Sequence, residues 1–385
     1  MEKVVQSIPT VDNFSLSSRE KLWTSYNIRD YVVQPSNAFS TSGSVAQQLR
    51  YSIPKYGLLN KLNLRIKVTM NDDGGDSSDD FAWTGLQFVE NVRIMRGSTE
   101  LYRIESKNLL AVIQHVSVSD EIIYEDAVPF GRSYANLSNG VQYVYYCPIF
   151  LGCFDEVDKL IDTEFMKDLE VVVSLKAVDA VLTNDTDDFT LDACDMLMQY
   201  LVLKDYETFY KKRYKSLPYR VSTKDMYNEA VTSFAGTAAT AYASDRLRIH
   251  CDKAVSHTYV FVAPSGTQGS YMNGVEITTL KVYDGDTVIH ETTSNIEGLL
   301  LHHTEYRKET HLKDNNSPSS SLVHVINWGV FSTEQLSNFR NLKDSNLYVE
   351  LTCTPAVTAT HGIYMAHEYY KWIDVDKSGD VKVVS

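Results

Sequence analysis

Apolar and polar residues alternate along much of the chain. This pattern predicts β-strands, because successive side chains of a strand point to opposite faces of a sheet, and the stretches concerned are rich in β-branched and aromatic residues. The predicted strands lie at 61–70, 90–97, 141–150, 168–178, 196–206, 245–251, 257–263, 277–285, 321–331, 346–353 and 362–373. Apolar residues at helical spacing predict short helices at 105–116, 155–166, 294–306 and 332–342. The chain is therefore expected to be mainly β.

These elements occur twice in the same order. The hairpin VRIMRGSTEL (92–101) matches LKVYDGDTVI (280–289) at an offset of 188 residues, and both turns contain Gly-x-Thr. Glycine there supplies the positive φ that a tight hairpin needs. In each copy the hairpin is followed by a helix, an aromatic strand, a short helix and two more strands. The period of roughly 190 residues far exceeds that of solenoids and propellers, so we predict two tandem β domains.

The number of strands in each copy favours a Greek-key or jelly-roll sandwich. We expect an N-terminal arm at 1–38, a first jelly roll at 39–207, a second jelly roll with its connector at 208–373 and a C-terminal tail at 374–385. The connector contains a basic run whose cations are Lys211, Lys212, Arg213, Lys215 and Arg220. We interpret this run as a solvated link between domains rather than a nucleic-acid site.

Composition excludes several classes of protein. The net charge of −14 argues against a surface that mainly binds nucleic acid or anionic lipid, because phosphate binding needs clustered cations. No apolar stretch approaches the roughly 18 residues of a membrane span, and the first residues lack the apolar run of a signal peptide. The five scattered cysteines indicate buried thiols in a reducing compartment rather than a disulfide framework.

Two segments resemble the double jelly-roll major capsid proteins. YSIPKYGLLNKLNLRIKV (51–68) is similar to the opening strand pair of these proteins, and the segment 85–115 is similar to their hairpin followed by a helix. A helix between the sixth and seventh strands of each roll, here 155–166 and 333–342, also matches. The family includes coat proteins of tailless membrane-containing phages and of nucleocytoplasmic large DNA viruses and, more distantly, the adenovirus hexon. The resemblance covers about 40–375.

The resemblance implies an all-β fold of two tandem eight-stranded jelly-roll sandwiches with short helices inserted between strands. It implies a structural major capsid protein, not an enzyme, whose homotrimer forms a pseudo-hexagonal capsomer that tiles an icosahedral virion shell. The implied partners are further copies of the chain, neighbouring capsomers, minor capsid or penton proteins and an inner viral membrane. The implied location is the virion of a DNA virus or phage, assembled inside the host cell, without sequence-specific nucleic-acid binding. The arm and the tail are expected to tie capsomers to their neighbours or to an inner layer.

We expect no catalytic residue, no cofactor and no metal site. The residues that come nearest to a metal site are Asp374, Asp376, Ser378 and Asp380, which follow the first positions of an EF-hand loop. The twelfth position of that loop is Ser385 instead of a bidentate glutamate, so we interpret the segment as a polar tail.

A second candidate metal site is a group of three histidines and one glutamate. It comprises His302 and His303 with Glu305 and His311. Adjacent residues on a helix point about 100° apart, so these two imidazoles do not converge. We therefore interpret the group as helix surface and packed side chains.

Two other functions remain open at this stage. Jelly rolls also occur in lectins and cupins, so the chain could be a carbohydrate-binding or carbohydrate-active tandem β-sandwich protein. A glycosidase would place two carboxylates about 5–10 Å apart, and a glycan binder would expose aromatic side chains on a concave face. The other alternative is a viral spike module, although a duplicated sandwich favours the shell.

Overall fold

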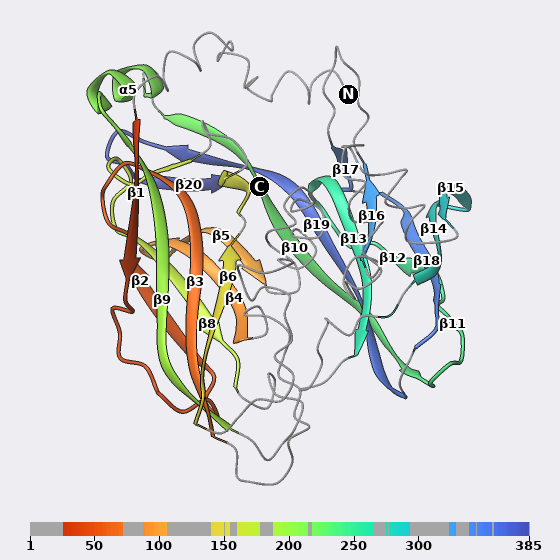
Figure 1. Cartoon of the computed structure of the whole chain (residues 1–385). Coiled ribbons are helices and arrows are strands. Elements are labelled where there is room, and N and C mark those ends of the chain that lie inside the picture. Colours follow the sequence, from red (N-terminus) through yellow and green to blue (C-terminus); the bar gives the residue numbers. More distant parts are fainter. Residues whose placement is uncertain are drawn as a thin grey trace.

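The structure is a computed structural model of the whole chain. It describes residues 26–71, 88–105, 140–149, 151–154, 160–177, 188–214, 218–264, 275, 277–292, 323–328, 339–343, 345–355 and 358–384. Two β-sandwiches lie side by side, one built from β1 to β9 and the other from β10 to β20 (Figure 1). Among the described residues, no helix is long and apolar enough to cross a membrane.

The first sandwich consists of two antiparallel sheets. One contains, in spatial order, β1 (Tyr26–Val33), β9 (Asp188–Leu203), β3 (Leu58–Asn71) and β6 (Gln142–Ile149), with β7 (Ile161–Asp162) also paired to β3. The other contains β2 (Gln47–Ser52), β8 (Leu169–Leu175), β4 (Val89–Arg96) and β5 (Thr99–Glu105). The helix α5 (Tyr206–Arg213) leads to the second sandwich.

The second sandwich has the same two layers. One sheet contains β10 (Tyr219–Gly236), β19 (Ala359–Val375), β13 (Ala254–Pro264) and β16 (Val323–Asn327), with β17 (Arg340–Asn341) on β13 and β20 (Val381–Val384) on β19. The other contains β11 (Tyr242–Ala243), β18 (Leu347–Cys353), β14 (Ile277–Asp284) and β15 (Thr287–Thr292), with β12 (Leu247–Arg248) on β18.

Both halves have one topology. When the main strands of each half are numbered in chain order, counting β11 and β12 as one, the two sheets read 1-8-3-6 and 2-7-4-5 in both. This is the order of an eight-stranded jelly roll. Even the two-residue strands β7 and β17 occupy the same place, each on the third strand of its half. The predicted fold class, two tandem jelly rolls, is confirmed.

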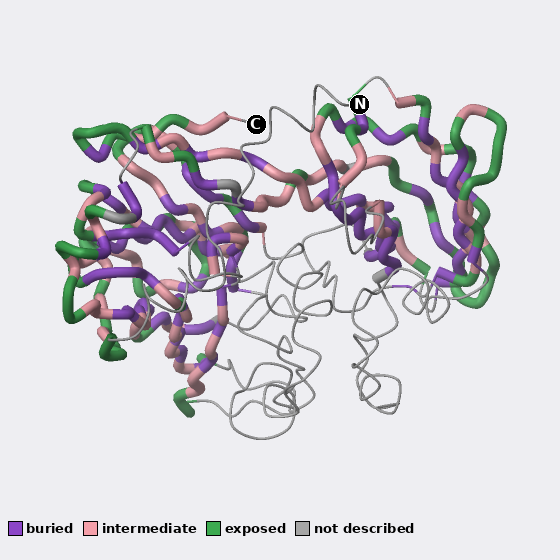
Figure 2. Tube along the Cα trace, turned by 90° about the horizontal axis from the view of Figure 1, so that it is seen from above, coloured by how far each residue is buried: buried purple, intermediate pink, exposed green. Residues whose placement is uncertain are grey.

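Each jelly roll buries its own apolar core between its sheets (Figure 2). In β3 the buried and partly exposed positions alternate, so that Leu64, Ile66 and Val68 face the first core. In the second half Val260 and Val262 of β13 meet Ile363 and Met365 of β19 in the second core. The alternation seen in the sequence is thus the alternation between core and outer face.

The first strand of each jelly roll was not predicted. The structure places β1 within the predicted arm 1–38 and pairs all of its residues with β9. β10 pairs with β19 along almost its whole length. Neither strand shows a clean alternation of apolar and polar residues. Most of β1 is exposed, and β10 carries Lys224 and Asp225, whose charges are paired inside the fold.

The predicted inserted helices also differ from the structure where it describes them. The end of the predicted helix 155–166 forms β7 and a turn, in which Asp162 Oδ1 accepts hydrogen bonds from the backbone N–H groups of Glu164 and Phe165. Residues 340–341 of the last predicted helix form β17. The predicted helical residues 106–116 and 294–306 lie outside the described residues. The tail is a strand as well, since β20 folds back onto β19.

Candidate functional site

The two jelly rolls meet at a surface that we call the junction. It is formed by β5 and the 3-10 turn Gly152–Phe154 of the first roll and by β10, β19 and β20 of the second. The contacts at this surface fix the position of one jelly roll relative to the other.

A buried ion pair lies at the centre of the junction. The ammonium group of Lys371 donates to a carboxylate oxygen of Asp225 and to the backbone carbonyl of Leu101, so it joins β19 to both β10 and β5. The same ammonium lies 4.5 Å from the centroid of the Tyr102 ring, and the Tyr102 hydroxyl donates to Thr223 Oγ1 at 3.2 Å. Lys371 is only 2% exposed. Two charges and three strands, β10 and β19 of the second roll and β5 of the first, are therefore fixed in one place.

Burial governs the protonation of the junction. It raises the pKa of Asp225 above the usual value, and the charge of Lys371 opposes that rise. Burial also holds the pKa of Tyr102 well above its usual value, so the phenol stays protonated as a hydrogen-bond donor. The junction thus keeps its hydrogen bonds at neutral pH.

Apolar packing continues the same contact. Ile363 and Met365 of β19 lie in the second core, whereas Ile373 and Val375 of the same strand lie in the core cluster of the first jelly roll. Val381 and Val383 of β20 pack against that first cluster as well. One strand is therefore shared by both cores, and the rolls cannot separate without exposing apolar side chains to water.

Backbone meets backbone at two points of the junction. A Cβ on Gly152 would overlap the backbone carbonyl of Lys224, and a Cβ on Gly379 would overlap the carbonyl of Phe165. Gly379 also has a φ of +78°, which L side chains rarely adopt. The close approach of the two rolls therefore requires glycine at both positions.

The connector is anchored rather than solvated. Arg213 is 5% exposed, donates to the carbonyl of Leu160 at 2.9 Å and lies near the rings of Phe209, Tyr214 and Tyr219. The buried carboxylate of Asp162 accepts hydrogen bonds from the hydroxyl groups of Tyr206 and Tyr214. The prediction of a solvated basic run is wrong for Arg213, because this arginine fixes α5 to the first jelly roll. Lys211 does lie on the surface, where it pairs with Glu207.

The four residues that came nearest to a metal site have structural partners. Asp374 forms a two-point ion pair with Arg220, at 2.5 and 2.8 Å. Ser378 Oγ lies 2.6 Å from a carboxylate oxygen of Asp376 and 2.6 Å from one of Asp380, which share its single proton. Asp380 also pairs with Arg96 of the first jelly roll. These contacts lower the pKa of each aspartate: Arg220 acts on Asp374, and the Ser378 hydroxyl is the largest influence on the other two.

This tail segment is therefore a tight turn between β19 and β20 that docks on the first jelly roll. Three of the four predicted residues come together in it, while Asp374 lies with Arg220. In the part of the chain that the structure describes, no three His, Cys, Asp or Glu side chains gather to hold a metal ion. The group at 302–311 lies outside that part.

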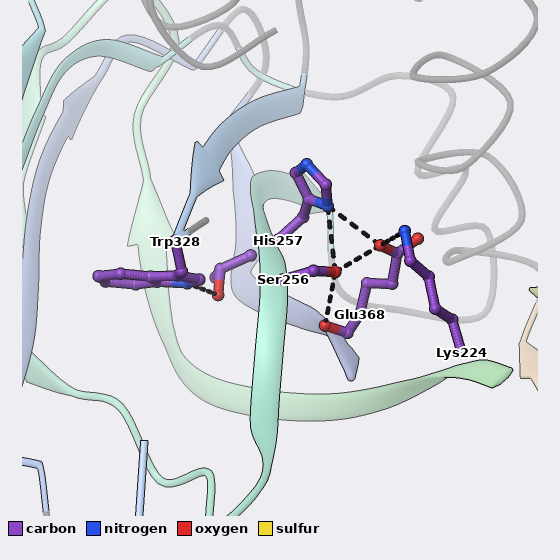
Figure 3. Close-up of polar contacts among 6 residues, drawn as sticks. Lys224, Ser256, His257, Trp328 and Glu368 are labelled. Carbon is purple, nitrogen blue, oxygen red and sulfur yellow. Dashed lines mark hydrogen bonds and ion pairs between the residues drawn. The ribbon is translucent and has the colours of Figure 1, made fainter. Parts of the chain in front are cut away.

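A second buried polar cluster lies on β10, β13 and β19 of the second jelly roll (Figure 3). The carboxylate of Glu368 accepts from Lys224 at 2.8 Å and from Ser256 Oγ at 2.5 Å, and it contacts His257 Nδ1 at 3.0 Å. Ser256 Oγ lies 3.2 Å from the same ring nitrogen of His257. In a Ser-His-Asp triad the serine and the carboxylate contact opposite nitrogens of the imidazole, so this cluster lacks the geometry of a triad.

Sequence reasoning missed both clusters. Their one signal is a charged residue within an apolar or aromatic run, such as Lys371 in YYKWIDV and Glu368 in MAHEYY. Such residues are rarely buried unless they are paired, but the partner strand β10 was itself not predicted.

The Glu368 cluster gives a prediction with a defined pH dependence. Burial alone would raise the pKa of Glu368, but Lys224 and His257 outweigh it and hold the pKa well below the usual value. We expect Glu368→Gln to lower the free energy of unfolding by about 3 kcal/mol at pH 7, because Lys224 loses its buried partner. The carboxylate stabilises the fold fully above the ordinary glutamate pKa of about 4.3, and this contribution disappears as the pH falls through the lowered pKa.

Urea unfolding at several pH values measures this effect. The difference between wild type and Glu368→Gln should shrink in acid. The partly exposed Glu170, paired with Arg50 at the surface, supplies the control Glu170→Gln, whose cost should stay below about 1 kcal/mol. A difference between wild type and Glu368→Gln that is equally large at every pH would contradict the assignment.

Comparison with known proteins supports the fold. No family model and no curated protein sequence matches the chain. Among solved structures, VP54 of PBCV-1 fitted into a reconstruction of the virophage Sputnik has a TM-score of 0.62 at 10% identity, over 94% of this chain and 97% of that chain. The Faustovirus major capsid protein has a TM-score of 0.59 at 9% identity, over 90% of each chain. The mavirus major capsid protein has a TM-score of 0.56 at 11% identity, over 98% of this chain and 93% of that chain. All three are double jelly-roll capsid proteins, and this chain shares their fold.

Proposed function

We propose that this chain is a structural major capsid protein of an icosahedral virus and that it has no catalytic role. The observation that carries the proposal is the pair of jelly rolls with one topology, held by a junction in which both cores share β19. The likeness to capsid proteins over nearly the whole chain supports it.

In the proposed mechanism the duplication supplies the geometry. Two similar rolls in one rigid subunit present two similar corners, so a homotrimer presents six and forms a pseudo-hexagonal capsomer. Repeated contacts between the same patches then tile a closed shell. The two rolls must keep a fixed relative orientation, because a flexible hinge between them would make the shape of the capsomer variable. The buried junction meets this requirement.

The proposal includes a revised division of the chain. The first jelly roll spans 26–203, α5 and the residues up to 218 connect the rolls, and the second jelly roll with its docked tail spans 219–384. We propose that residues 1–25, which precede β1, tie a capsomer to its neighbours. Minor capsid or penton proteins and an inner viral membrane are the further proposed partners, in a virion assembled inside the host cell.

Size-exclusion chromatography with light scattering tests the proposed function. We expect a stable particle of three times the mass of the chain, and shells or flat hexagonal arrays in electron micrographs of concentrated protein. A stable monomer that binds glycans would contradict the proposal and favour a carbohydrate-binding sandwich.

A further inference from the structure

The internal repeat allows each residue of one hairpin to be matched with a residue of the other. Both turns have glycine at positive φ, Gly97 in the β4–β5 hairpin and Gly285 in the β14–β15 hairpin. Both hairpins also have a bulge after the turn, which leaves Leu101 of β5 and Ile289 of β15 outside the pairing. Leu101 therefore corresponds to Ile289, and the next residue, Tyr102, corresponds to His290.

The first strands can be matched through their partners. The register of β3 with β9 shifts between Leu59 and Lys61, and the register of β13 with β19 shifts in the same way between Val255 and His257. These shifts align Tyr200 of β9 with Tyr369 of β19. Their partners are Arg29 on β1 and Asp225 on β10, so these two residues correspond.

Corresponding strands differ sharply in exposure. In the junction, β5 of the first roll packs on β10 of the second, and Leu101 and Tyr102 are each 1% exposed. On β15 the matching region is open, with Ile289 and Val288 each 43% exposed. The strand that matches β10 is β1, where Tyr26, Ile28 and Val32 are between 45% and 59% exposed. β1 and β15 lie at opposite ends of the molecule (Figure 1).

The charges at these positions are reversed. Inside the chain, the backbone N–H of Arg103 on β5 donates to Asp225 on β10. The corresponding residues are Glu291 on β15 and Arg29 on β1. A contact between β15 and β1 would therefore place Glu291 beside Arg29, two residues of opposite charge. Within the chain, by contrast, Asp225 is paired with Lys371 and the Arg103 side chain with Glu105.

We propose that copies of the chain join head to tail, with β15 of one copy against β1 of the next, in the manner in which β5 meets β10 within each chain. This contact rests on the proposed function and specifies the surface through which its copies associate. It covers the exposed Val288 and Ile289 of β15 with the face of β1 that carries Asn27 and Arg29 in a second copy. Head-to-tail contacts of one kind close into a ring when the rotation permits, and every contact in that ring is then of one type, from the fifth strand of one roll to the first strand of the next.

Cross-linking with bis-maleimidoethane tests the contact. Asn27 and His290 correspond to Thr223 and Tyr102, which are hydrogen-bonded in the junction. All five native cysteines are buried, so the reagent should act on the introduced thiols. The double variant Asn27→Cys/His290→Cys should give covalent dimers and trimers on a denaturing gel, and each single variant should give monomers. The control pair Glu170→Cys/His290→Cys, with Glu170 on the other sheet, should also give monomers.

The outcomes separate this contact from the proposed function. A wild-type chain that stays monomeric would contradict both. A wild-type trimer whose double variant forms no cross-link would overturn the contact alone. Cross-linked dimers of a single variant would overturn it too, because they would indicate a two-fold contact.

Charge reversal provides an independent measurement. We expect Arg29→Glu and Glu291→Arg each to raise the dissociation constant of the trimer by about tenfold or more, and the double reversal to restore it. Glu170→Arg is the control, because Glu170 lies on the other sheet of the first jelly roll, where it pairs with Arg50, and should leave the trimer unchanged. A double reversal whose trimer has a higher dissociation constant than the trimer of either single variant would overturn the proposal.

Discussion

Lys371→Met is expected to lower the free energy of unfolding by about 3–5 kcal/mol, the cost of leaving one partner of a buried ion pair without the other. Methionine fills a similar volume, so the loss comes from Asp225, whose carboxylate would stay buried without its cation. The carbonyl of Leu101 would also lose its hydrogen bond. Because Lys371 bonds to groups on both jelly rolls, the variant should weaken the junction as well as the second roll.

Urea unfolding at pH 7 measures the loss, and limited proteolysis reports whether the two rolls come apart. The double variant Lys371→Met/Asp225→Leu should recover most of the stability, because it removes both charges. The exposed Lys61 supplies the control Lys61→Met, with an expected change below about 0.5 kcal/mol. A loss below 1 kcal/mol for Lys371→Met would show that the pair does not hold the junction.

Deletion of residues 1–33 is expected to abolish soluble, cooperatively folding protein, whereas deletion of residues 1–25 should not. The longer deletion removes β1, so β9 becomes an unprotected edge strand. It also removes Tyr31 and Val33, which pack against the first core, and burial of such side chains contributes about 1.5–3 kcal/mol each. The shorter deletion leaves every described strand in place.

Soluble yield and thermal unfolding measure the difference between the two deletions. The shorter variant should also retain the trimer while shell assembly fails, since it lacks only the proposed arm. Equal stability of the two variants would contradict the assignment of β1 to the first jelly roll.

The repeat and the fold class could be read from the sequence because most strands have one face in a core. In β3, alternate residues such as Leu64 and Ile66 face the interior, and the side chains between them do not. The glycines of the two hairpins were visible for a similar local reason, since their positive φ restricts the residue type. Features that depend on neighbouring residues alone were therefore predictable.

The junction could not be read in this way, because its partners are distant in sequence. Lys371 and Asp225 are 146 residues apart, and each looks like a surface charge until both strands are placed. The same pairing hides β10, whose buried charges break the apolar pattern. The predicted helix 155–166 was wrong at its end for a related reason. Asp162 serves there as the acceptor for a turn and for two tyrosines of the connector, Tyr206 in α5 and Tyr214 just after it.

A three-dimensional reconstruction of the purified chain by electron cryo-microscopy would test the proposed three-copy capsomer most directly. We predict a ring of three copies with six jelly rolls around its centre, each first roll lying between the second roll of its own chain and that of a neighbour. Isolated subunits, or dimers related by a two-fold axis through β1, would contradict the account.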